Sequence, residues 1–153
     1  MTDIHIATAD GTSNVLEEAT VRAFAAGLSG PLLSPGDAGY EETRKVWNGM
    51  IDRRPALIAR CAGVTDVATA VGFARSHGLL LSVRGGGHNT PGIAVCEGGL
   101  MIDLAGMRSV RVDPVQCTAR VEGGATWSDF DRETQLFGLA TTGGPFRTRA
   151  LAG

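Results

Sequence analysis

The most informative stretch of the chain reads Arg84-Gly85-Gly86-Gly87-His88-Asn89 and directly follows the apolar run 79–83. This pattern predicts a strand that ends in a glycine loop at the rim of a sheet. Three consecutive glycines remove every Cβ from a short arc of backbone, so successive N–H groups can turn inward and bind an anion such as a pyrophosphate. Arg84 adds a positive charge at the edge of the arc. His88 adds a side chain that can act as a nucleophile, acid or base near neutral pH.

Taken alone, the triple glycine also suits a flexible turn with His88 as a surface residue beside it. The loop is not the dinucleotide-binding fingerprint, because the G-x-G-x-x-G spacing and the helix that should open there are both missing. Pro91-Gly92 follows instead and favours a loop. The loop by itself therefore predicts a phosphate-bearing ligand and nothing more specific.

Motifs on both sides of the loop follow one another in an order and spacing typical of one family. They are Tyr40, Trp47-Asn48 and the blocks 55–61, 64–67, 83–89, 99–104, 121–127 and 138–144. In this order they resemble the FAD-linked oxidases of the berberine bridge enzyme type, in the vanillyl-alcohol oxidase/PCMH superfamily. The resemblance covers roughly residues 30–144. It implies an α+β fold, namely the first subdomain of a PCMH-type FAD-binding domain and the start of the second.

The resemblance also implies the cofactor and its contacts. It assigns to His88 a covalent bond to the 8α-methyl carbon of FAD. Relatives often have a second bond from a cysteine near the position of Thr141 or Thr142, but this chain has no cysteine there, so a single histidyl bond is expected. A β-branched residue at Gly86 is expected to be strained at positive φ. The residues expected to contact FAD are Arg84, Gly85, Gly86, Gly87, His88, Asn89, Gly92, Thr142 and Gly143.

For the complete enzyme, the resemblance implies hydride transfer from an alcohol or an activated C–H bond of a small-molecule substrate to FAD, with dioxygen as the acceptor. The catalytic base of such enzymes comes from later regions, so no catalytic residue is assigned here. The only tyrosine, Tyr40, resembles a packing position. This chain alone is expected to be inactive. The alternative from another class is a truncated, non-catalytic nucleotide-binding module.

Composition excludes several classes of function. The 153 residues suffice for one domain with a hydrophobic core, and a net charge of −2 gives no reason to expect nucleic acid or an anionic membrane as partner. No apolar stretch approaches the length of a membrane span and no secretory signal is present, so a cytoplasmic location is expected. The three cysteines form no C-x-x-C pair and predict neither a metal site nor a disulfide framework. Cys61, within an apolar run, is expected to be buried.

Local patterns predict the elements of the first half. A helix is expected from Ser13-Asn14 to Gly27, after an N-terminus in which His5 is frayed. Residues 28–39 read as a loop and 57–60 as a strand. Thr65 is expected to cap a helix that ends at Gly78, with His77 in its last turn. The inner face of that helix is expected to carry Val67, Val71 and Ala74, and the next strand, 79–83, should be parallel to the first.

The second half reads as short strands followed by a helix. Strands are expected at 100–102, 110–112 and 119–121, with a turn at Asp113-Pro114 between the last two. Thr126 is expected to begin a helix with Asp129 near its N-terminus, and Gly138 to end it. The buried side of this helix is expected to consist of Trp127, Phe130 and Phe137.

Three regions are therefore expected: an N-terminal helix and loop over 1–39, an incomplete FAD-binding domain over 40–144, and an aberrant or disordered tail over 145–153. The resemblance calls for a Thr/Gly-rich continuation after Pro145. The sequence instead continues with Phe146 and contains Arg147 and Arg149. This change is expected to result from a reading-frame slip. A deliberately shortened chain or a divergent relative is the alternative.

Overall fold

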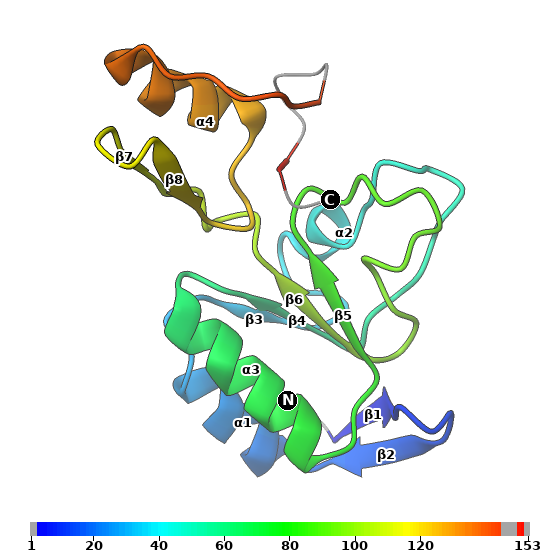
Figure 1. Ribbon diagram of the computed structural model, residues 1–153. Coiled ribbons are helices and arrows are strands. Elements are labelled where there is room, and N and C mark those ends of the chain that lie inside the picture. Colours follow the sequence, from blue (N-terminus) through cyan, green and yellow to red (C-terminus); the bar gives the residue numbers. More distant parts are fainter. Residues whose placement is uncertain (1–2, 145–149, 152–153) are drawn as a thin grey trace.

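The computed structural model describes residues 3–144 and 150–151, and Figure 1 shows their arrangement. The central feature is a four-stranded sheet in the order β3-β4-β6-β5. Its strands are β3 (Leu32–Leu33), β4 (Leu57–Arg60), β5 (Leu81–Arg84) and β6 (Leu100–Asp103). β6 pairs in parallel with both β4 and β5, whereas β3 pairs antiparallel with β4. With the helices described below, this sheet confirms the predicted α+β class.

The strand–helix–strand unit is present, but its two strands do not pair with each other. β4 and β5 are parallel, and β6 lies between them. All four residues of β6 are buried, as is typical of a strand covered on both faces in a parallel sheet. β5 begins two residues later than predicted, because Leu79 instead forms an isolated antiparallel bridge with Thr8.

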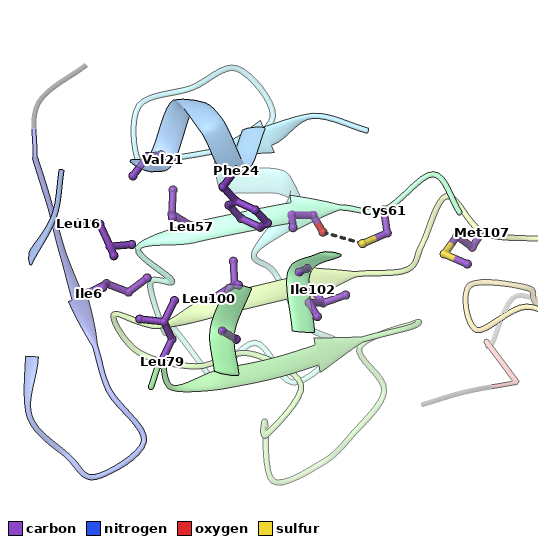
Figure 2. Close-up of a cluster of buried hydrophobic side chains, with 13 residues drawn as sticks. Ile6, Leu16, Val21, Phe24, Leu57, Cys61, Leu79, Leu100, Ile102 and Met107 are labelled. Atoms are coloured by element: carbon purple, nitrogen blue, oxygen red, sulfur yellow. Dashed lines mark hydrogen bonds between the residues drawn. The ribbon is translucent and has the colours of Figure 1, made fainter. Parts of the chain in front are cut away.

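Alternate residues of β4 and β6 point into two hydrophobic clusters on opposite faces of the sheet, as the two-residue period of a strand requires. The larger cluster, drawn in Figure 2, lies between the sheet and the two helices α1 (Glu18–Ala26) and α3 (Val64–Ser76). These two helices contact each other through Phe24 and Phe73, whose rings stack with centroids 4.0 Å apart. The buried Cys61 belongs to this cluster, as predicted, and burial raises the pKa of its thiol to about 11.

The smaller cluster lies on the other face of the sheet and includes Ile58, Met101 and Tyr40. Tyr40 begins α2 (Tyr40–Thr43), is fully buried, and donates its hydroxyl hydrogen to the Pro55 carbonyl oxygen at 2.6 Å. The predicted packing role of this tyrosine is therefore confirmed.

The N-terminal prediction is wrong over residues 13–16. Ser13 and Asn14 do not begin a helix but lie in β2 (Ser13–Leu16), which pairs antiparallel with β1 (Ile4–Ala7). His5 is accordingly paired with Val15 and is not frayed. The helix begins only at Glu18 and ends, as predicted, at Gly27. Pairing with β1 outweighs the local helix signal, because it buries Leu16 to 2% exposure in the larger cluster.

α3 also differs in detail from the prediction. Its N-cap is Gly63, so Thr65 lies within the first turn. His77 is at the C-cap, as expected for the last turn. Ala74 is buried and Val67 packs against the larger cluster, as predicted, whereas Val71 is 43% exposed. Asp66 and Ala70 are the other buried residues of α3, and with Ala74 they form a stripe at four-residue spacing.

Asp66 connects α3 to two preceding loops. Its carboxylate accepts backbone hydrogen bonds from Ser29 at 2.9 Å, Gly30 at 3.0 Å and Ala62 at 2.8 Å. These N–H groups, that of Ser29 first, hold the pKa of Asp66 below its usual range despite the opposing effect of burial. Because the folded-state pKa lies below the unfolded value of about 4, the carboxylate stabilises the fold above that pH. This contribution is lost as the pH falls through the folded-state pKa.

We expect Asp66→Asn to lower the free energy of unfolding by about 2–3 kcal/mol at neutral pH, because an NH₂ group would replace one acceptor oxygen. Urea denaturation measures the change, and the gap to the wild type should shrink below about pH 4. The control is Asp113→Asn, since Asp113 accepts N–H bonds in an exposed turn where asparagine serves equally well. An equally stable Asp66→Asn variant, or a gap unchanged in acid, would contradict this role.

The second half forms a smaller unit, drawn above the central sheet in Figure 1. β7 (Val110–Asp113) and β8 (Thr118–Val121) form the predicted hairpin, and α4 (Trp127–Thr134) contacts β7. Thr126 and Asp129 form a reciprocal capping box at the start of α4. Burial would raise the pKa of Asp129, but hydrogen bonds from Thr126 and Arg108 lower it to about 2.

The predicted burial of Phe137 is wrong. Phe130 is buried, whereas Phe137 is 49% exposed. After Thr134 the chain tightens into the 3₁₀ turn η1 (Gln135–Phe137), so the α-helical phase that would align Phe137 with Phe130 is lost. Gly138, in the left-handed region with φ +67°, ends this turn as expected.

Residues on both sides of the expected boundary at 39/40 share one core. Ile6, Leu16, Val21 and Phe24 lie in the same cluster as Leu57 and Leu100. Residues 145–149 and 152–153 of the expected tail lie outside the described residues, and the reading-frame slip stays a prediction. Within that tail, Ala150 pairs with Thr126 and the Leu151 N–H donates to Ala125. In the described part of the chain, no helix is long and apolar enough to span a membrane.

Candidate functional site

The glycine loop begins at the carboxyl edge of the parallel strands. β4, β6 and β5 end at Arg60, Asp103 and Arg84, which are register partners across the sheet. In open sheets with parallel strands, ligands usually bind outside this edge. The loop follows β5 there, as the sequence predicted.

The three glycines differ in conformation. Only Gly87 has a positive φ, +67°. The expected strain at Gly86 from a positive φ is therefore wrong. Gly86 excludes a side chain for another reason: a Cβ there would lie 2.4 Å from the Ala150 Cβ and 2.8 Å from the His88 Nδ1.

The backbone N–H groups of the glycine arc are available as hydrogen-bond donors. The N–H groups of Gly85, Gly86 and Gly87 donate to no acceptor within residues 3–144 and 150–151. The Gly87 carbonyl, in contrast, accepts a bond from the Trp47 N–H at 2.9 Å. Buried or half-buried N–H groups without an acceptor are rare in folded proteins. Three in succession are what an anion-binding arc requires.

Arg84 lies beneath the arc in a cluster of charged side chains. Its Nη1 donates to the Asp103 carboxylate at 2.9 Å, and Arg60 Nε lies 3.4 Å from the other carboxylate oxygen. Asp103 is 1% exposed. Arg84 is therefore fixed in position, and Asp103 partly neutralises its charge. The Arg84 Nε is buried and has no hydrogen-bond partner among the described residues, so one donor stays available next to the loop.

His88, Asn89 and Gly92, which are all expected to contact FAD, have different surroundings in the structure. The half-buried His88 ring lies against Gly86. Asn89 accepts the Ile93 N–H at 3.0 Å on its side-chain oxygen. Gly92, with φ +73°, packs against Ile51, where a Cβ would lie 2.7 Å from the nearest side-chain atom. Asn89 and Gly92 therefore shape the loop, and their expected contact with FAD stays a prediction.

Thr142 and Gly143 lie in the second half of the molecule. Both are exposed, and a Cβ on Gly143 would lie 2.4 Å from the Trp127 ring. Their connection to the glycine loop is indirect: Ala150 pairs with Thr126, next to Trp127, and packs against Gly86. Their expected contact with FAD stays a prediction.

Sequence reasoning assigned no role to three residues that hold the loop. Asp103 fixes Arg84, the Trp47 backbone binds Gly87, and Arg53 donates to the carbonyls of Gly92 and Val95. A charged residue closing the apolar run 100–102 was a signal for Asp103. The other two contacts join segments about forty residues apart, for which no local signal exists.

Other features of the described residues lie away from the glycine loop. A hollow of about 480 Å³ lies away from the loop, between the start of α3 and the β7–β8 hairpin, and is lined by Val64, Met107, Arg111 and Arg120 among others. No group of three or more His, Cys, Asp or Glu side chains that could hold a metal ion occurs in the described part of the chain.

Comparisons with known proteins agree with this geometry. The sequence model of an FAD binding domain matches residues 55–147. The (R)-6-hydroxynicotine oxidase of Paenarthrobacter nicotinovorans is 40% identical over 117 residues, which are 76% of this chain and 26% of that protein. The crystal structure of 6-hydroxy-D-nicotine oxidase from Arthrobacter nicotinovorans matches with a TM-score of 0.76 at 38% identity, over 81% of this chain and 27% of that one.

A third match concerns the fold alone. BBE-like 1 of Physcomitrella patens has a TM-score of 0.77 at 23% identity, over 87% of this chain and 29% of that one. The chain thus spans little more than a quarter of the length of these relatives. It belongs to the FAD-binding-domain family of FAD-linked oxidoreductases, as the resemblance to the berberine bridge enzyme type predicted, and it corresponds to only part of those proteins.

Proposed function

We propose that this chain binds FAD through the loop from Arg84 to Asn89. The observation that carries the proposal is the row of N–H groups of Gly85, Gly86 and Gly87, which donate to no acceptor among the described residues. The buried Arg84 Nε, also without a partner there, adds a fourth donor below the same arc. A pyrophosphate supplies acceptor oxygens and negative charge that match this set.

Each residue of the loop has a distinct role in the proposed site. The glycine N–H groups bind phosphate oxygens, and the absence of a Cβ lets the cofactor approach the backbone. Asp103 holds the Arg84 guanidinium under the arc. His88 would hold the flavin through a bond from an imidazole nitrogen to the 8α-methyl carbon; a methyl C–H bond breaks, the flavin takes up the electron pair, and dioxygen reoxidises it. Positions 141 and 142 are threonines, so no cysteine is present there to form a second bond.

The proposed chemistry is oxidation of a small-molecule substrate. A bound FAD would supply the chemistry to oxidise an alcohol or an activated C–H bond by hydride transfer, with dioxygen as the final electron acceptor. This chain contributes the binding site, and we assign it no catalytic base: Tyr40 is buried and its hydroxyl is bonded to Pro55. The activity belongs to a complete enzyme, because this chain covers only 26% of the 6-hydroxynicotine oxidase that it matches.

The absorbance of the purified protein in the flavin region, measured before and after acid precipitation, tests the proposal. A flavin spectrum that stays with the precipitate supports FAD covalently bound to His88. A spectrum that moves to the supernatant supports FAD binding without the covalent bond. A colourless protein that also fails to take up added FAD would favour the alternative, a truncated module without activity of its own.

A further inference from the structure

The loop of residues 87–95 is hydrogen-bonded to a segment about forty residues earlier in the chain. This segment, residues 44–53, is here called the brace. It donates hydrogen bonds to four carbonyl oxygens of residues 87–95: Trp47 N–H to Gly87 at 2.9 Å, Asn48 Nδ2 to Thr90 at 3.1 Å, and Arg53 Nη1 to Gly92 at 2.9 Å and to Val95 at 3.0 Å. The brace therefore contacts the loop along its whole length.

The brace is itself held firmly. Arg44 is 8% exposed and its guanidinium donates to Glu41, to Asp52 and to the Arg53 carbonyl oxygen. Ile51 packs against the smaller hydrophobic cluster and against Gly92. The donors of the brace are thus presented from a fixed backbone.

The direction of these bonds matters for the glycine arc. The structure has no cis peptide bond among its described residues, and in a trans peptide the C=O and the following N–H point in opposite directions. Because Trp47 binds the Gly87 carbonyl from one side, the His88 N–H points to the other. The brace therefore fixes which way the peptide between the last glycine and His88 faces.

We propose that Arg53 is the positioning residue of this loop: its two bonds to Gly92 and Val95 hold residues 87–95 in the orientation in which the glycine arc binds the cofactor. This inference rests on the proposed function. Arg53 acts through the loop, because its two hydrogen bonds to this loop go to Gly92 and Val95, beyond the glycine arc. Both bonds come from one nitrogen, Nη1, so an ammonium group can replace part of the interaction.

The neighbouring Arg54 provides a matched control. Its side chain is 52% exposed and forms an ion pair with Glu41 at 2.8 Å, away from the loop. Arg54→Gln removes the same charge as Arg53→Gln, one residue further along, without removing a bond to residues 87–95. A difference between the two variants therefore reports on the loop contacts and not on net charge.

The test uses the full 153-residue chain and two measurements, hydrogen exchange of loop peptides and titration with FAD. In Arg53→Gln, exchange should rise in residues 87–95 and not in α3, and FAD should bind about tenfold more weakly, because two hydrogen bonds that hold the loop are lost. Arg53→Lys should show loop exchange and an FAD affinity between those of Arg53→Gln and the wild type. Arg54→Gln should match the wild type in both measurements.

The outcomes separate this inference from the proposed function. If the wild type binds no FAD, the proposed function fails, and the positioning role fails with it. If the wild type binds FAD and Arg53→Gln binds it equally well, the positioning role alone is overturned. Exchange that rises equally in α3 would also overturn it, since Arg53 would then stabilise the whole fold and not the loop.

Discussion

In the His88→Ala variant, acid precipitation should release all bound flavin into the supernatant. The change removes the only side chain of the loop that can form the proposed covalent bond. It leaves the backbone N–H groups of the arc in place, so non-covalent binding should persist. The fold should also persist, because a loop side chain contributes little to either hydrophobic cluster. Absorbance of the pellet and of the supernatant measures the result.

His5→Ala is the control for this experiment. His5 is exposed in β1, outside the glycine loop, so its variant should keep flavin in the pellet as the wild type does. Acid-stable flavin in His88→Ala would show that another residue forms the bond.

Gly86→Val should weaken FAD binding by about two orders of magnitude. A Cβ at this position would lie 2.4 Å from the Ala150 Cβ and 2.8 Å from the His88 Nδ1, so the arc would have to move. Displacement of this kind costs about 1–3 kcal/mol, and each 1.4 kcal/mol is a factor of ten in affinity. Titration with FAD followed by flavin fluorescence measures the change.

Gly72→Val is the matched substitution for this prediction. Gly72 is exposed in the middle of α3, and a Cβ there meets nothing within 4 Å. FAD affinity should therefore be unchanged in Gly72→Val. If Gly86→Val also bound FAD as tightly as the wild type, the cofactor would not lie against the arc.

Elements whose signals lie within a few residues could be predicted from the sequence. Thr126 and Asp129 are three residues apart and form the capping box that their spacing indicates. Gly27 and Gly138 end their helical segments as expected. In these places the conformation depends on backbone geometry and local hydrogen bonds, which neighbouring residues determine.

Elements that depend on distant partners could not be predicted. Residues 13–16 carry a helix-start pattern but pair with β1, and this pairing with another segment determines their conformation. The central position of β6 likewise depends on which strands lie beside it. A short apolar run predicts that a strand is buried, but it does not predict which strands lie beside it.

The same division holds within the candidate site. The position of the loop after a strand followed from the sequence, because the apolar run and the glycines adjoin. The partner of Arg84 could not be predicted from the sequence. Asp103 lies nineteen residues away and contacts Arg84 only because of the register in which β5 and β6 pair. The expected contacts of Asn89 and Gly92 with FAD stay predictions; within the chain, Asn89 accepts the Ile93 N–H and Gly92 packs against Ile51.

Titration of the purified 153-residue chain with FAD, after any flavin already bound has been quantified, shows whether the chain binds the cofactor. We expect a total of one FAD per chain, with saturable quenching of flavin fluorescence for whatever fraction of sites is not already filled. A chain that contains no flavin and leaves the fluorescence of added FAD unchanged would contradict this expectation.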